Sequence, residues 1–198
     1  GRRPAEPASR AAMLEREIKL RFGSPQEARD ALVALGATPV RERRLQDDAL
    51  LDNEQDGLRQ RRCALRVRRE GPRSFLTFKG PAQPGPMKLR EELETAVADA
   101  DVLQRVLEHL GLRVWFRYQK HREEFTLDGV VVAIDETPIG TFVELEGTEA
   151  GITAAAAGLG RTTADYILDS YCGLFMRDRE ALGFRGMHMV FDEPDRIT

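Results

Sequence analysis

The 198-residue sequence is poor in cysteine and aromatic residues, and it contains no long apolar stretch. Its two cysteines, Cys63 and Cys172, are too few for a disulfide framework and lack the Cys-x-x-Cys spacing of a zinc site. No apolar run approaches the roughly 20 residues of a membrane-spanning helix, and no signal-peptide core is visible. These absences predict a cytoplasmic protein without a membrane partner, in which both cysteines are buried packing residues.

The sequence also lacks an excess of basic residues. Lysine and arginine total 30 against 33 aspartates and glutamates, which gives a net charge of −3. A general nucleic-acid-binding protein usually shows a basic excess, so we expect no nucleic-acid partner. The chain has the length of one ordinary domain. Residues 1–12, rich in Pro, Ala and Arg, are predicted to be disordered, and residues 13–191 are predicted to form a single domain.

The first periodic segment, residues 14–22, is strand-like and unusually charged. At a period of two residues, Glu15, Glu17 and Lys19 fall on one face, and the opposite face is mainly apolar. A strand of this kind can face bulk water or a polar cavity equally well. A cavity lined with both signs of charge can hold a divalent metal ion together with a polyphosphate.

The same charged alternation recurs along the chain. In each case Arg, Lys, Asp or Glu share a strand face, with few neutral polar residues between them. The charged positions are Arg66 and Arg68; Lys79, which shares its face with Thr77; Arg90, Glu92 and Glu94; Lys120 and Arg122; Asp135; and Glu144 and Glu146.

Two interpretations of these strands remain open from the pattern alone. Any one of them is most simply the solvated face of an amphipathic antiparallel strand. For the whole set, a second arrangement accounts better for the charges: the strands close into a barrel whose charged faces converge on a wet lumen. In that case helices cover the apolar outside.

Such a lumen suits a narrow range of chemistry. Clustered Arg and Lys bind phosphate oxygens through charge-assisted hydrogen bonds. Clustered carboxylates suit Mg²⁺ or Mn²⁺, which bridge carboxylates and phosphates. Together they favour phosphoryl transfer, in which catalysis is mostly positioning and charge neutralisation.

The remaining patterns predict an α+β fold dominated by antiparallel strands. Ser24, Pro25 and Glu27 open a helix that ends at Gly36, and a second helix covers residues 99–110. Residues 39–45 and 49–52 are predicted as two separate strands. The tail is predicted to be helical over residues 152–157 and 163–175.

The strand Glu15-Arg16-Glu17-Ile18-Lys19 resembles the Glu-x-Glu-x-Lys signature of the CYTH superfamily, the triphosphate tunnel metalloenzymes. The superfamily takes its name from class IV adenylate cyclase and thiamine triphosphatase. Five residues alone are a weak match, and the later charged pairs, in the same order as in the family, make it specific. The resemblance covers roughly residues 14–147 and, more loosely, the tail.

The resemblance implies an eight-stranded antiparallel β-barrel that forms a tunnel for a triphosphate, with helices packed outside. It also implies roles for the charged residues, in three overlapping groups. The phosphate-binding residues would be Lys19, Arg66, Arg68, Lys79, Arg90, Lys120 and Arg122. The ligands of Mg²⁺ or Mn²⁺ would be Glu15, Glu17, Asp135, Glu144 and Glu146, with Asp135 alternatively positioning the phosphate-binding residues. The catalytic residues, which activate the attacking water, would be Glu15, Glu92 and Glu94.

The stretch from Tyr118 to Glu144 is most similar to the branch labelled class IV adenylate cyclase. Characterised cyclases carry a His-Phe pair just before the first strand, where this chain has Ala11-Ala12-Met13-Leu14. We therefore expect hydrolysis of tripolyphosphate or an organic triphosphate, with cyclisation of ATP as the alternative. A non-catalytic module that binds polyphosphate or nucleotides is a further alternative. The protein is expected to be a monomer or a homodimer.

Overall fold

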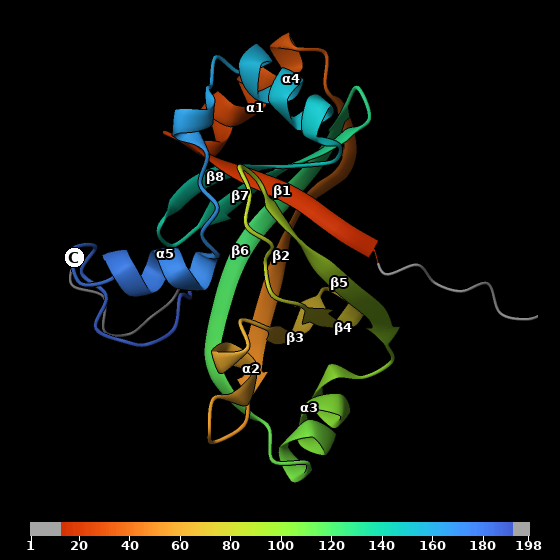
Figure 1. Cartoon of the computed structure of the whole chain (residues 1–198), viewed down its shortest axis with the longest axis vertical. Helices are drawn as coiled ribbons and strands as arrows, with labels where there is room; N and C mark the ends of the chain where they lie inside the picture. The colour runs from red at the N-terminus through yellow and green to blue at the C-terminus, as the bar shows by residue number, and fades with distance from the viewer. Residues whose placement is uncertain (1–12, 192–198) are drawn as a thin grey trace, which may run out of the picture.

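The computed structural model describes residues 13–191, so the disorder predicted for residues 1–12 lies outside the described residues. Eight antiparallel strands close into a barrel in the order β1-β5-β4-β3-β2-β6-β7-β8 (Figure 1). This confirms the predicted fold. The strands are β1 (Met13–Phe22), β2 (Thr38–Asp52), β3 (Ala64–Glu70), β4 (Arg73–Lys79), β5 (Lys88–Val97), β6 (Arg113–Leu127), β7 (Val130–Thr137) and β8 (Gly140–Glu146).

Helices cover the outside of the barrel. Figure 1 shows α1 and α4 together at one end, α3 at the opposite end and α5 along one side. Ser24 caps α1 and Asp99 caps α3, as their sequence signals predicted. The helices are α1 (Pro25–Ala34), α2 (Gly57–Gln60), α3 (Ala100–His109), α4 (Glu149–Gly158) and α5 (Tyr171–Asp178), with a 3₁₀ turn, η1 (Thr163–Asp165).

Strand alternation separates an apolar outer face from a charged inner face. On β1, Ile18 and Leu20 are fully buried and join the apolar cluster formed with α1 and α4. Their neighbours Glu17 and Lys19 are also buried, but they point to the inside of the barrel and line its cavity. The charges of the inner face are therefore enclosed by protein rather than solvated on an outer surface.

The structure corrects the prediction of two separate strands over residues 39–52. These residues form the single strand β2, which pairs with β6 through register shifts between Pro39 and Arg44 and at Leu50. Gln46 and Asp48, in the predicted gap, are almost completely buried. A polar segment that faces an enclosed cavity has the composition of a loop, and this explains the error.

The structure also corrects the continuous helix predicted over residues 163–175. Residues 163–165 form η1, and α5 begins only at Tyr171, after Ser170 as its cap. Between them, Ile167 pairs with Lys19: its N–H donates to the carbonyl of Lys19 at 2.9 Å, and its carbonyl accepts at 3.0 Å. The C-terminal segment is thus attached to the first strand, and this attachment places α5 beside the barrel.

The strand register brings charged residues of opposite ends of the chain together. Glu17 of β1 lies opposite Lys88 of β5 on one side and Glu146 of β8 on the other. Lys19 lies opposite Glu144. Among residues 13–191, no helix is long and apolar enough to cross a membrane.

Candidate active site

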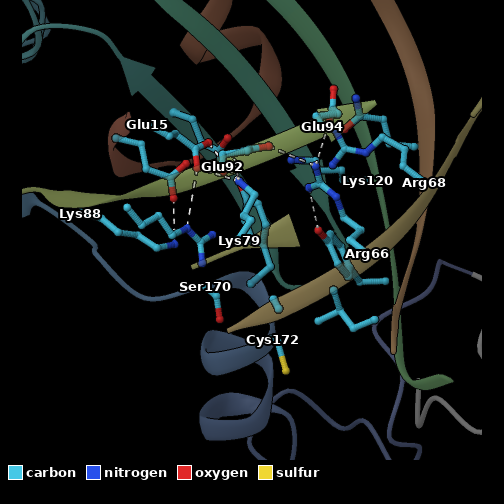
Figure 2. A pocket seen from close by; sticks show the side chains of 18 of the residues that line it. Glu15, Arg66, Arg68, Lys79, Lys88, Glu92, Glu94, Lys120, Ser170 and Cys172 are labelled. Carbon is cyan, nitrogen blue, oxygen red and sulfur yellow. Dashed lines mark hydrogen bonds and ion pairs between the residues drawn. The ribbon is translucent and has the colours of Figure 1, made fainter. Parts of the chain in front are cut away.

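The inside of the barrel holds a cavity of about 740 Å³. All the residues predicted for the site line this cavity except Asp135, which lies completely buried behind it. Figure 2 shows the acids and bases pointing toward one another from different strands, with Ser170 and Cys172 below them at the start of α5. Cys63 and Cys172 line the cavity and are half-buried rather than fully buried as predicted, although Cys172 does pack against the apolar cluster that contains Phe175.

Two lysines contact the buried carboxylate of Glu17. Its Oε1 lies 3.1 Å from Lys19 Nζ and 2.8 Å from Lys88 Nζ. Burial alone would raise the pKa of Glu17, but Lys19 and Lys88 hold it well below its usual range. Burial and the positive charge of Lys19 lower the pKa of Lys88 to about 8. Lys19 also lies 3.5 Å from Glu144.

A second group of charges lies further along the cavity (Figure 2), where Lys79 is shared by two acids. Its Nζ lies 2.8 Å from Glu15 and 2.6 Å from Glu92. Burial and the neighbouring carboxyl of Glu92 raise the pKa of Glu15 to about 8. The pKa of Glu92 falls to about 2 because its hydrogen bond with Glu15 and the charge of Lys79 outweigh its own burial. Arg90 lies beside this group, 3.7 Å from Glu15.

A third group is centred on Asp135 of β7. Its carboxylate accepts from Lys120 Nζ at 2.8 Å, from Arg122 Nε at 2.7 Å and from the hydroxyl of Tyr171 at 2.7 Å. Arg122 also pairs with Glu144. Burial and the neighbouring guanidinium of Arg122 lower the pKa of Lys120 to about 8. Because its oxygens are occupied by three side chains, Asp135 is placed to hold the neighbouring bases.

The two arginines of β3 lie across the cavity. Arg68 forms a double hydrogen bond with Asp48, at 2.7 and 2.8 Å. Arg66 donates to Glu94 at 3.3 Å and to Thr77 at 3.1 Å, as Figure 2 shows for Glu94. The Nε atom of Arg66 is buried and has no hydrogen-bond partner among residues 13–191. An unsatisfied buried donor of this kind suits a ligand oxygen.

The chemistry of the acids fits a divalent cation. Glu146 has no ion-pair partner among residues 13–191, and burial followed by the charges of Glu17, Glu92 and Glu144 raises its pKa. Carboxylates that repel one another are the environment that a hard cation neutralises. The described residues contain no three acidic, histidine or cysteine side chains already close enough to hold a metal ion. Glu15 and Glu17 are instead paired with lysines.

Several residues in or behind the cavity lining escaped the sequence analysis, among them Lys88 and Tyr171 of the lining and the fully buried Asp48. Lys88 has the same strand parity as Arg90 and Glu92, so extending that alternation by one step would have found it. Asp48 was missed because β2 was predicted as two strands. Tyr171 comes from a helix and carries no strand periodicity, so no signal in the sequence connects it with the barrel.

A family model described as CYTH domain matches residues 13–171. The chain belongs to the CYTH family. This confirms the resemblance seen in the sequence.

This CYTH protein is similar in sequence or structure to several proteins, all at less than 30% identity in the examples that follow. One from Methanocaldococcus jannaschii, named "putative adenylate cyclase", is 29% identical over 135 residues, 68% of this chain and 77% of that one. A solved structure of a "putative adenylate cyclase" from Vibrio parahaemolyticus has a TM-score of 0.71 at 21% identity, covering 81% of this chain and 97% of that chain. A "putative adenylyl cyclase" from Hippeastrum, described as having a dominant triphosphatase activity, has a TM-score of 0.63 at 18% identity, covering 83% and 95%.

Proposed function

We propose that this CYTH protein is a divalent-metal-dependent hydrolase of inorganic or organic triphosphates. The observation that carries the proposal is the lining of the cavity, where seven predicted phosphate-binding bases and six predicted acids face one enclosed space. Charge of both signs inside a barrel is costly to bury and contributes little to stability. A ligand with several phosphates and a metal ion would use both signs at once.

In this proposal the bases bind the phosphates. Lys19, Arg66, Arg68, Lys79, Arg90, Lys120 and Arg122, all predicted from the sequence, would bind the phosphate oxygens, joined by Lys88. Asp135 would position Lys120 and Arg122, which is the second of the two roles predicted for it.

Glu17, Glu144 and Glu146 would hold Mg²⁺ or Mn²⁺, with Glu15 beside them. When bound, the metal would neutralise charge on the phosphate oxygens and orient them. The lysines that now pair with Glu17 would then turn to the phosphates.

Hydrolysis requires an attacking water and a base. In the proposed reaction the water oxygen attacks the terminal phosphorus, the bond to the bridging oxygen breaks, and the remaining phosphates leave as an anion held by the bases. Either Glu15 or Glu92 would accept the proton of the water, and Glu94 lines the same cavity. Glu15 can accept a proton once it is deprotonated, at pH values above the pKa of about 8 to which its burial and the neighbouring carboxyl of Glu92 raise it.

The alternative is cyclisation of ATP, which the names of several relatives favour. In that reaction the ribose 3′-hydroxyl attacks the α-phosphorus and pyrophosphate leaves. Both reactions would use the same bases and acids. The Hippeastrum protein of the same fold, with its dominant triphosphatase activity, supports hydrolysis as the first choice.

Product analysis distinguishes the candidates. The protein is incubated with tripolyphosphate, thiamine triphosphate or ATP, each with Mg²⁺ or Mn²⁺. Orthophosphate release is the expected result. Cyclic AMP with pyrophosphate would identify a cyclase instead, and binding without turnover would identify a non-catalytic module.

The variants Glu17→Gln and Glu146→Gln test the metal assignment. We expect each to lower metal-dependent turnover by at least about a hundredfold while the fold is kept, because each removes a charge that would bind the cation. The matched control is Glu136→Gln on the outer face of β7, where Glu136 pairs with the exposed Arg43. Turnover by both variants at the wild-type rate would refute the metal assignment.

A further inference from the structure

Tyr171, the first residue of α5, contacts the bases of the tunnel from outside the barrel sheet. Its side chain is almost completely buried. Its hydroxyl donates to Asp135 Oδ2 at 2.7 Å. Its ring centroid lies 4.9 Å from Lys120 Nζ and 5.3 Å from Lys19 Nζ. One residue therefore contacts an acid and two of the proposed phosphate-binding lysines.

Packing holds the ring of Tyr171 independently of its hydroxyl. The ring meets Phe142 of β8 edge-on, with centroids 5.4 Å apart. Leu174 and Phe175, further along α5, are buried in the same apolar cluster. The backbone pairing of Ile167 with Lys19 attaches the preceding segment to β1. These contacts fix the position of the ring, so removing the hydroxyl should leave the ring in place.

The contacts of Tyr171 differ in kind from those of the acids. A carboxylate attracts an ammonium and neutralises it, whereas an aromatic face stabilises the ammonium and leaves its charge for an anion. The hydroxyl, in turn, donates to Asp135 Oδ2, the oxygen that also binds Lys120. Without this donor, the buried Oδ2 would lose one of its hydrogen bonds, and only Lys120 and Arg122 would remain to satisfy it.

We propose that Tyr171 is a positioning residue for the triphosphate. Its hydroxyl holds Asp135 and its ring holds Lys19 and Lys120, so that both ammonium groups face the tunnel. This inference rests on the proposed function, because it assumes a triphosphate in the tunnel.

The test is the variant Tyr171→Phe, which keeps the ring and removes the hydroxyl. The affinity for tripolyphosphate is measured by titration calorimetry, and KM and kcat are measured with the same substrate. We expect the Kd and the KM to rise roughly tenfold. This is the change in affinity that corresponds to losing about one hydrogen bond to a charged group. The kcat should stay within about twofold, because the lysines bind the substrate and the transition state alike.

The matched control is Phe175→Leu on the same helix, which loosens the packing of α5 without touching Asp135 or the lysines. It should lower the thermal midpoint at least as much as Tyr171→Phe and leave the Kd unchanged. The inference is overturned if Tyr171→Phe binds with the wild-type Kd, or if Phe175→Leu weakens binding equally. Absence of tripolyphosphate binding by the wild type would instead refute the proposed function, and this inference with it.

Discussion

Single residues of the tunnel differ in how firmly they keep their charge. Lys19 lies between Glu17 and Glu144, which raise its pKa above its ordinary value despite its burial. Lys88 and Lys120 each lie beside another cation, and their pKa values fall to about 8. Burial is common to all three lysines, so the neighbouring charges decide the direction of each shift.

The affinity for tripolyphosphate should therefore fall as the pH rises through about 8. Lys88 and Lys120 then lose their protons and no longer attract phosphate, whereas Lys19 stays charged. The measurement is the Kd at constant ionic strength between pH 7 and 9.5. The double variant Lys88→Arg and Lys120→Arg should lose most of this pH dependence, because a guanidinium does not deprotonate in this range. Lys19→Arg is the control and should keep the wild-type slope.

The same pKa shifts predict the opposite sign for the stability of the ligand-free protein. Between about pH 8 and 10.5 the unfolded chain keeps protons that Lys88 and Lys120 have lost in the folded state. These two residues therefore raise the free energy of unfolding as the pH increases through this window. For binding, the contradicting result is a double variant Lys88→Arg and Lys120→Arg whose Kd depends on pH as strongly as that of the wild type. It would mean that neither lysine causes the loss of affinity at high pH.

At the scale of elements, strand alternation predicted most of the charged lining, and the resemblance to the CYTH superfamily predicted the closed eight-stranded barrel. A period of two residues places Glu15, Glu17 and Lys19 on one face whatever the neighbouring strand is. It does not say which residues of two strands lie opposite, so the shared contacts of Lys79 and Asp135 emerge only from the register. Tyr171 was unpredictable for a different reason, because it reaches the tunnel through tertiary packing of α5.

Helix α1 should contribute to stability and not to chemistry. Leu32 of α1 is fully buried against the outer face of the barrel. Leu32→Ala should lower the free energy of unfolding by about 2–5 kcal/mol through the lost contacts and the cavity left behind. Urea denaturation measures this change, and kcat/KM at a temperature where the variant is folded should be unchanged.

The adjacent residue provides the matched control for this substitution. Val33 lies on the same helix with 59% of its surface exposed, and Val33→Ala should change the stability by no more than about 0.5 kcal/mol. Equal effects of the two substitutions would mean that α1 does not stabilise the barrel by burying its apolar face. A loss of activity in folded Leu32→Ala would mean that α1 influences the tunnel directly.

At the scale of the whole molecule, the tunnel bases and acids neutralise one another through contacts across the barrel. Glu17 contacts lysines from two strands, and Asp135 contacts groups from β6 and α5. Pairs of this kind are weak contributors to stability when buried, because desolvation offsets most of the attraction. These pairs can be replaced when ligands bind, because a polyphosphate would pair with the bases and a cation would pair with the acids.

A triphosphate should therefore stabilise the whole barrel. At a concentration 100 times its Kd, a ligand that binds only the folded state adds about 2.7 kcal/mol. For a domain of this size that corresponds to a rise of roughly 5–10 °C in the thermal midpoint. The measurement is a thermal unfolding curve with tripolyphosphate and Mg²⁺, compared with sodium chloride of equal ionic strength.

Two variants decide whether that rise comes from the tunnel. Lys19→Gln removes a base at the centre of the lining and should abolish most of the shift, because the phosphates lose a charged partner that is already oriented. Arg43→Gln removes an exposed base on the outer face, where Arg43 pairs only with Glu136 among residues 13–191, and should keep the full shift. Equal shifts in both variants, or an equal shift with sodium chloride alone, would place the phosphates outside the barrel. A shift seen in the wild type and in Arg43→Gln but lost in Lys19→Gln would place the anion inside the barrel. The reason is that Lys19 is 2% exposed and lines the cavity.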